Sequence, residues 1–75
     1  MAKNNSEKNA VYKMLELTGT STRSSDDAIK NAIARASQTV RNLRWFEVIE
    51  QRGAIDGGEV AEWQVTVKCG FRLDK

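Results

Sequence analysis

The chain has 75 residues, a formal net charge of +2, one cysteine and no histidine. A chain this short forms one small domain, whose single core contributes only about 3–5 kcal/mol of stability. The lone cysteine excludes an internal disulfide, and the missing histidine excludes a Cys–His zinc site and Ser-His-Asp or Cys-His catalysis. Oligomerisation is the remaining source of stability, so the composition predicts an assembly.

The first ten residues, MAKNNSEKNA, are polar and show no apolar period. They predict a mobile tail, residues 1–10, before a single domain over residues 11–75. No apolar run approaches the roughly 20 residues of a membrane span, and the N-terminus lacks the apolar segment of a secretory signal. Together with the single thiol, these features predict a cytoplasmic protein with no membrane partner. The small net charge gives no electrostatic reason to expect nucleic acid.

Residues 11–20, VYKMLELTGT, predict the first strand. The small polar residues that follow Gly19 predict a loop. Ser24 has Asp27 three residues further on, close to the capping box that opens many helices. Apolar residues then recur at helical spacing as far as Leu43, which predicts an amphipathic helix of about 18 residues.

Two further strands, residues 44–55 and 59–73, flank the sequence Asp56-Gly57-Gly58, which is typical of a hairpin turn. The order β-α-β-β predicts an α+β fold, a three-stranded antiparallel sheet wrapped around one amphipathic helix. One helix covers only one side of such a sheet. The other side must therefore meet solvent, a ligand or another subunit.

Trp45 and Phe46 are neighbours in the second of these strands, so their side chains must point to opposite faces. The apolar alternation of residues 59–73 marks the face toward the helix, and Phe46 and Val48 match it. Trp45 then lies on the uncovered face, near a cluster of polar side chains. That cluster comprises Glu47, Gln51, Gln64, Thr66, Lys68 and Arg72.

The position of the hairpin turn sets the pairing of the last two strands. A turn at Asp56-Gly57 pairs Trp45 with Lys68 and Ile49 with Gln64. A turn at Gly57-Gly58 pairs Trp45 with Gly70 and Gln51 with Gln64. Both registers put Trp45 and Gln64 on one face, whereas an odd turn or a bulge would break this parity.

An exposed tryptophan on a small sheet has two interpretations, of which a subunit contact comes first and a stacking platform for a planar ligand second. Cys69 on the apolar face is interpreted as a small buried residue and not a redox group. Trp63 is placed on the core side or at its rim. The basic edge of Arg35, Arg41 and Arg44 is explained by a solvated helix face or intersubunit ion pairs more simply than by RNA.

Several segments, taken together, resemble one known family. They are VYKMLELTGTS, DDAIKNAIARASQTVRNLRWFEV, EQRG and VAEWQVTVKCGFRL. Their combination over Val11 to Leu73 resembles the dodecins, small flavin-binding proteins of bacteria and archaea. Arg44 departs from that pattern, because many bacterial relatives carry an aspartate before the tryptophan.

The resemblance implies a hollow homododecamer that stores or buffers flavin and is not an enzyme. Bacterial members favour FMN, and some also hold coenzyme A, so the expected cofactor is FMN, or else riboflavin or another flavin. Flavins in this family are sandwiched between the tryptophans of two subunits. The matching stacking residue is Trp45, and the residue that hydrogen-bonds the flavin ring is Gln64. For a flavin phosphate, the candidate cations are Arg44, Arg52, Lys68 and Arg72.

Two other functions compete with this one. A flavin-dependent reductase would need a nicotinamide site, but the chain lacks a G-x-G-x-x-G motif, and a flavin between two indoles offers no face to a substrate. A basic oligomeric shell would bind nucleic acid along the arginine-rich helix edge, with strong salt dependence.

Overall fold

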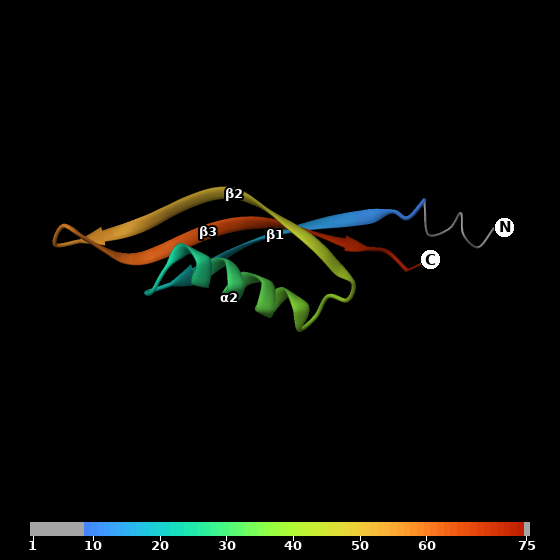
Figure 1. The fold of residues 1–75 in the computed structure, drawn as a ribbon, viewed down its shortest axis with the longest axis horizontal. Helices are drawn as coiled ribbons and strands as arrows, with labels where there is room; N and C mark the ends of the chain where they lie inside the picture. Colours follow the sequence, from blue (N-terminus) through green and yellow to red (C-terminus); the bar gives the residue numbers. More distant parts are fainter. Residues whose placement is uncertain (1–8, 75) are drawn as a thin grey trace.

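The computed structural model describes residues 9–74. Its elements are β1 (Tyr12–Ser21), α2 (Ser25–Ser37), β2 (Leu43–Asp56) and β3 (Glu59–Arg72). The strand order is β1-β3-β2, and both strand pairs are antiparallel. This confirms the predicted β-α-β-β fold, with one helix on one face of the sheet (Figure 1). The predicted tail, residues 1–10, lies almost entirely outside the described residues.

The helix begins where the sequence predicted, at a side-chain cap. Ser24 has extended backbone, and its hydroxyl accepts a hydrogen bond of 3.0 Å from the backbone N–H of Asp27. The Asp27 carboxylate in turn accepts a 2.8 Å hydrogen bond from the Ser21 hydroxyl at the end of β1. This hydrogen bond, with the nearby charge of Arg23, holds the pKa of Asp27 below its usual value. The β1–α2 loop is therefore fixed at both ends by polar contacts.

The helix ends six residues earlier than Leu43, the predicted end, so the predicted length was wrong. Its last residue is Ser37, and Asn42 has a φ of 68°, a left-handed conformation that turns the chain into β2. The β-branched residues Thr39 and Val40 favour helix less than the alanines before them. Leu43 still packs against the core as predicted, but it does so as the first residue of β2.

Among residues 9–74, the fully buried side chains of the core cluster are all small. Ala28 and Ala32 of α2 meet Val65, Val67 and Cys69 of β3, all of them at most 3% exposed. The close approach of α2 to the sheet depends on this small size. Gly19 of β1 lies at a point of close approach, because a Cβ atom there would overlap the carbonyl oxygen of Ala28 and lie 2.9 Å from the Ala32 Cβ.

The larger apolar side chains remain outside this core. α2 packs on β1 and β3 and leaves β2 largely uncovered. Within the described part of the chain, ten large apolar side chains are exposed by 39% or more. They are Val11, Tyr12, Met14, Trp45, Phe46, Val48, Ile49, Ile55, Val60 and Leu73. A single chain therefore buries alanines of α2 and valines of β3 and leaves many of its larger apolar groups exposed, which is typical of a subunit that completes its burial by association.

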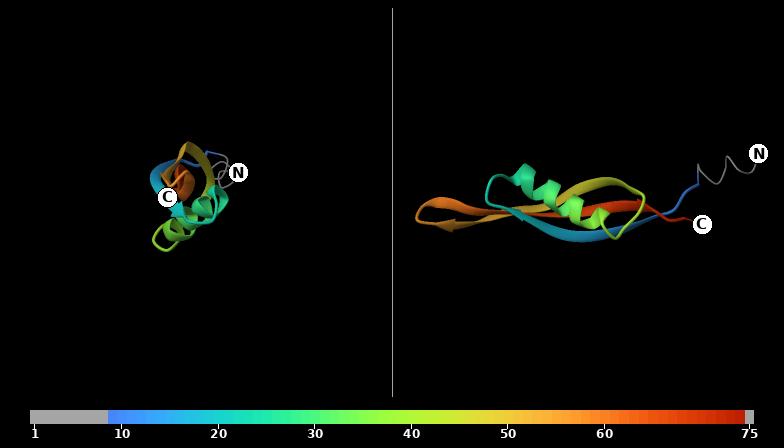
Figure 2. Two further views of the ribbon diagram at one scale, coloured as in Figure 1. Left: turned by 90° about the vertical axis from the view of Figure 1, so that its left-hand side faces the viewer. Right: turned by 90° about the horizontal axis from the view of Figure 1, so that it is seen from below.

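The described chain is long and thin, with extents of 62 × 20 × 14 Å. The β2–β3 hairpin extends well beyond the N-terminal end of α2, as Figure 2 shows from below. At its tip Gly57 and Gly58 have φ values of 61° and 80°, the conformation of a two-residue hairpin turn. The turn thus occupies the second of the two predicted positions.

Candidate functional site

The sheet face opposite α2, here called the outer face, carries the predicted site residues in cross-strand rows. One row joins Glu16, Lys68 and Glu47, and the next joins Thr18, Thr66 and Glu50. The hydroxyls of Thr18 and Thr66 lie 2.7 Å apart in a hydrogen bond across the strands. The outer face is therefore polar along its middle.

A bulge at Arg44 sets the orientation of Trp45. Leu43 pairs with Phe71 while Trp45 pairs with Gly70, so Arg44 is an extra residue in β2. Without it Leu43 and Trp45 would share a face, since strand side chains alternate. The bulge lets Leu43 reach the core while Trp45 points to the outer face.

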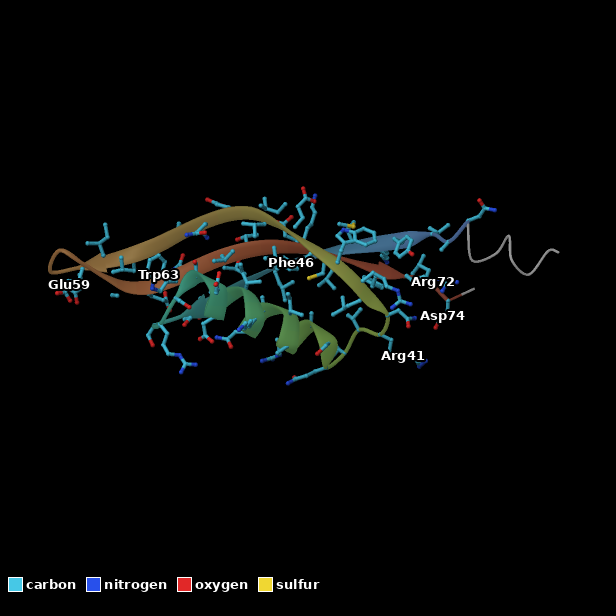
Figure 3. All side chains as sticks on the ribbon, viewed as in Figure 1. Arg41, Phe46, Glu59, Trp63, Arg72 and Asp74 are labelled. Atoms are coloured by element: carbon cyan, nitrogen blue, oxygen red, sulfur yellow. The ribbon has the colours of Figure 1, made fainter. Side chains whose placement is uncertain are left out.

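Phe46 lies on the helix side of the sheet, opposite Cys69, as predicted. It is not buried there, however, because it keeps 45% of its surface exposed. With Ile33 of α2, Leu43 and Cys69, it lines an apolar groove of about 170 Å³ between α2 and β2. Figure 3 shows Phe46 in this position, below the β2 ribbon.

The indole of Trp45 rests on the glycine opposite it. A Cβ atom at Gly70 would overlap the six-membered ring of the indole, and even the Cη2 atom would lie only 2.8 Å away. Tyr12 of β1 lies beside the indole, with ring centroids 4.9 Å apart and planes tilted by 52°. Trp45 nevertheless remains 45% exposed. The indole therefore packs against the sheet on one side and is accessible from solvent on the other.

A second bulge changes the prediction for the far half of β2. Val48 pairs with Val67, but Glu50 pairs with Thr66, so Ile49 is an extra residue. Gln51 therefore lies opposite the buried Val65 on the helix side, and its predicted place in the outer polar cluster was wrong.

The same bulge brings Arg52 to the outer face, opposite Gln64. The Arg52 Nε donates a 2.9 Å hydrogen bond to Gln64 Oε1, and Arg52 Nη1 lies 2.9 Å from Glu50 Oε1. Gln64 Nε2 donates a 2.9 Å hydrogen bond to Glu62 Oε1. Two predicted site residues, Gln64 and Arg52, are thus joined in one polar cluster.

Trp45 and Gln64 share the outer face, but they do not meet in one chain. Trp45 lies opposite Gly70 of β3, and Gln64 lies six residues before Gly70 on the same strand (70 − 64). At about 3.3 Å per residue this separation is about 20 Å, further than the two side chains can span.

The structure separates the four candidate cations. Arg52 lies beside Gln64, and Lys68 lies between Glu16 and Glu47. Arg44 is adjacent to Trp45 in the bulge and lines the apolar groove. Arg72 pairs with Tyr12, the neighbour of Trp45. Arg44 and Arg72 are therefore the cations near the indole, Arg52 is the cation near the amide, and Lys68 is flanked by two carboxylates.

Arg72 also borders a second hollow, of about 250 Å³, at the end of the sheet away from the hairpin. Residues 39–42 form one wall, and residues 71–74 form the other. The Asn42 amide bridges them through a 2.9 Å hydrogen bond to Asp74 Oδ1. Figure 3 shows Arg41, Arg72 and Asp74 gathered at this end.

Sequence reasoning assigned no role to Tyr12, the aromatic neighbour of Trp45. The available signal was its alternation, which already placed Tyr12 on the same strand face as Met14 and Glu16. What the pattern lacked was the strand order. Tyr12 and Trp45 approach across β3 only because β3 is central in the sheet and its residue between them is a glycine.

The Cys69 thiol is a buried core group, as the sequence predicted. It is 1% exposed, opposite Leu15 and Phe46, and burial raises its pKa. Because the thiolate is the reactive form, we expect alkylation of native protein by iodoacetamide at pH 8 to be at least about tenfold slower than in denaturant. Mass spectrometry over time checks this. Equal rates would show that Cys69 is accessible.

Among residues 9–74, no three acidic or cysteine side chains are grouped closely enough to hold a metal ion. Over the same part of the chain, no helix is both long and apolar enough to cross a membrane. The cytoplasmic location stays a prediction.

An open sheet with a half-exposed aromatic and a polar cluster on its uncovered face defines a small binding module of the α+β class. The comparisons with known proteins give its family. The dodecin family model matches residues 11–74. The dodecin of Thermus thermophilus is 51% identical over 65 residues, which are 87% of this chain and 94% of that protein.

Solved structures agree with the family model. The dodecin of Streptomyces coelicolor superposes with a TM-score of 0.85 at 52% identity, covering 89% of this chain and 96% of its own. A calcium dodecin of Mycobacterium tuberculosis is 31% identical over 64 residues, 85% of this chain and 90% of that protein. The chain belongs to the dodecin family, as the sequence motifs indicated.

Proposed function

We propose that the protein binds and stores a flavin, FMN or riboflavin, in a homo-oligomer, and that it is not an enzyme. The observation that carries this proposal is the Trp45 indole, which is supported from beneath by Gly70 and remains 45% exposed on the outer face. The isoalloxazine of a flavin is flat and electron-poor. An indole face stacks on such a ring with about 0.5–1.5 kcal/mol beyond the buried area.

A second copy of the chain would complete the site. Because Trp45 and Gln64 are about 20 Å apart along β3, one flavin cannot reach both in a single chain. Association of subunits through their exposed apolar groups would bring the Gln64 of one chain toward the Trp45 of another. This supports a homo-oligomer, for which the family resemblance implies twelve copies.

Gln64 supplies the polar half of the site. An amide both donates and accepts, which matches the alternating N–H and C=O groups on the pyrimidine edge of a flavin. In the free chain this amide is already oriented by hydrogen bonds with Arg52 and Glu62. Binding would exchange one of these bonds for a bond to the ligand, while Arg52 holds the amide in place.

Stacking also predicts what happens to light absorbed by the flavin. An indole in contact with an excited isoalloxazine transfers one electron to it. The electron then returns to the indole without absorption of further light. No bond forms or breaks, and the excitation is lost as heat. Stored flavin would therefore be photochemically quiet.

Titration of ligand-free protein into FMN or riboflavin tests the proposal. We expect flavin fluorescence to fall by more than about tenfold at saturation, because electron transfer from a stacked indole competes with emission. Fluorescence that stays bright at micromolar protein would contradict the proposal. Steady oxidation of NAD(P)H by the flavin-loaded protein would favour the reductase instead.

A coenzyme A site is a second candidate, favoured by the hollow at the end of the sheet. Its lining includes Arg41 and Arg72, whose guanidinium groups suit phosphate oxygens. Calorimetric titration with coenzyme A checks this. Binding that weakens on Arg41→Ala while flavin binding is retained would support two separate ligands.

A further inference from the structure

We propose that Tyr12 and Gly70 are positioning residues that hold the Trp45 indole in one orientation before any ligand arrives. The inference rests on the proposed flavin site, which it deepens, but the geometry that carries it belongs to the ligand-free chain. It assigns a role to the glycine of the segment KCGFRL and to the tyrosine at the start of β1.

Gly70 lies directly beneath the indole. Three atoms of the indole six-membered ring, Cε2, Cζ2 and Cη2, are the nearest atoms to the point where a Cβ of residue 70 would stand. The ring therefore lies over the glycine backbone with one face toward β3. Any side chain at this position would occupy the space of the ring, so the indole can lie flat only over glycine.

Tyr12 packs beside the indole. It reaches Trp45 from the opposite edge of the sheet, across β3, with a centroid distance of 4.9 Å and a tilt of 52°. Tilted aromatic pairs at this separation attract each other through their quadrupoles. Tyr12 is 39% exposed and Trp45 is 45% exposed, so neither ring is fixed by burial. Their mutual contact and the contact of the indole with Gly70 restrict its orientation.

The consequence is a platform with one covered face and one free face. Exposed side chains ordinarily lose rotamer freedom when a ligand immobilises them, and this loss weakens binding. An indole already confined by Gly70 and Tyr12 avoids most of that loss. The ligand then meets a surface whose orientation is already set.

The test reads Trp45 alone, in a Trp63→Phe background, because these are the two tryptophans of the chain. Three variants are compared in that background, Tyr12→Leu, Tyr12→Phe and Gly70→Ala. Glu16→Ala, on the same strand and face as Tyr12, is the matched control. The first readout is Trp45 emission and acrylamide quenching without ligand. The second is the Kd for riboflavin, which carries no phosphate.

We expect Tyr12→Leu and Gly70→Ala to shift the emission, increase the quenching and weaken riboflavin binding by about three- to tenfold, the loss that immobilising one side chain predicts. Tyr12→Phe keeps the ring and should restore both readouts, and Glu16→Ala should change neither. Should Gly70→Ala fail to fold, the two Tyr12 variants still test the positioning role.

The outcomes separate the two proposals. Unchanged emission and quenching in Tyr12→Leu would overturn the positioning role, as would changed emission with an unchanged Kd. A parent protein that binds no flavin, while Tyr12→Leu still frees the indole, would overturn the proposed function and leave the positioning of Trp45 supported.

Discussion

Replacing Trp45 by alanine is expected to weaken flavin binding by at least roughly 30-fold, or about 2 kcal/mol, the loss typical of a central aromatic anchor. The indole is the large planar surface of the outer face, and its loss removes both the stacking contact and the electron donor for quenching. The oligomer should survive, because the exposed apolar groups of β2 and the hairpin remain. Fluorescence titration and size-exclusion chromatography with light scattering measure the two effects.

Two further variants make this result specific. Trp45→Phe keeps a smaller aromatic face and should lose less affinity than Trp45→Ala. Trp63→Phe changes the other tryptophan, which packs against the core, and should leave the affinity almost unchanged. A Trp45→Ala protein that binds flavin with full affinity would refute the stacking assignment, whatever its oligomeric state.

Replacing Gly19 by alanine should strongly destabilise the folded subunit. Its Cβ would overlap the Ala28 carbonyl oxygen and crowd Ala32, so the whole helix would have to move away from β1. Overpacking ordinarily costs about 1–3 kcal/mol, and a rigid helix backbone as the obstacle places this change near the upper end. The entropy gained by replacing a strand glycine, about 0.5–1 kcal/mol, offsets only part of that cost.

Because a core of this size supplies about 3–5 kcal/mol, we expect Gly19→Ala to leave little folded subunit outside the assembly. Urea unfolding followed by circular dichroism measures the loss. Thr20→Ala, the next residue along and exposed on the outer face, should stay within about 0.5 kcal/mol of the parent. Equal midpoints for Gly19→Ala and the parent would show that α2 can shift at no cost.

The periodic patterns determined most of the fold. Alternation in residues 59–73, the cap at Ser24 and the glycine pair in the hairpin each act through local geometry, and local geometry can be predicted from neighbouring residues. The same reasoning put Trp45 and Phe46 on opposite faces. The end of α2 was predicted too late because Val40 and Leu43 continue the helical spacing, and spacing cannot report the left-handed turn at Asn42.

The candidate site was predicted only in part. Trp45 and Gln64 do share the outer face, and the predicted pairing of Trp45 with Gly70 is present. Gln51 was misplaced, and Arg52 was not expected beside Gln64, because the register is shifted by one residue between the bulge at Ile49 and a compensating irregularity between Ala54 and Ile55. A bulge is stabilised by how two strands fit together, so the alternation of either strand alone does not reveal it.

By itself, the sequence determined the element order, the apolar face of β3, the exposed indole and the family, since each follows from local periodicity or from motifs along the chain. The tertiary structure decided which side chains meet. Tyr12 reaches Trp45 because β3 lies between their strands with Gly70 beneath the indole, and Trp45 stays about 20 Å from Gln64 because the sheet is extended. Contacts across strands depend on register and strand order, which arise only when the whole sheet forms.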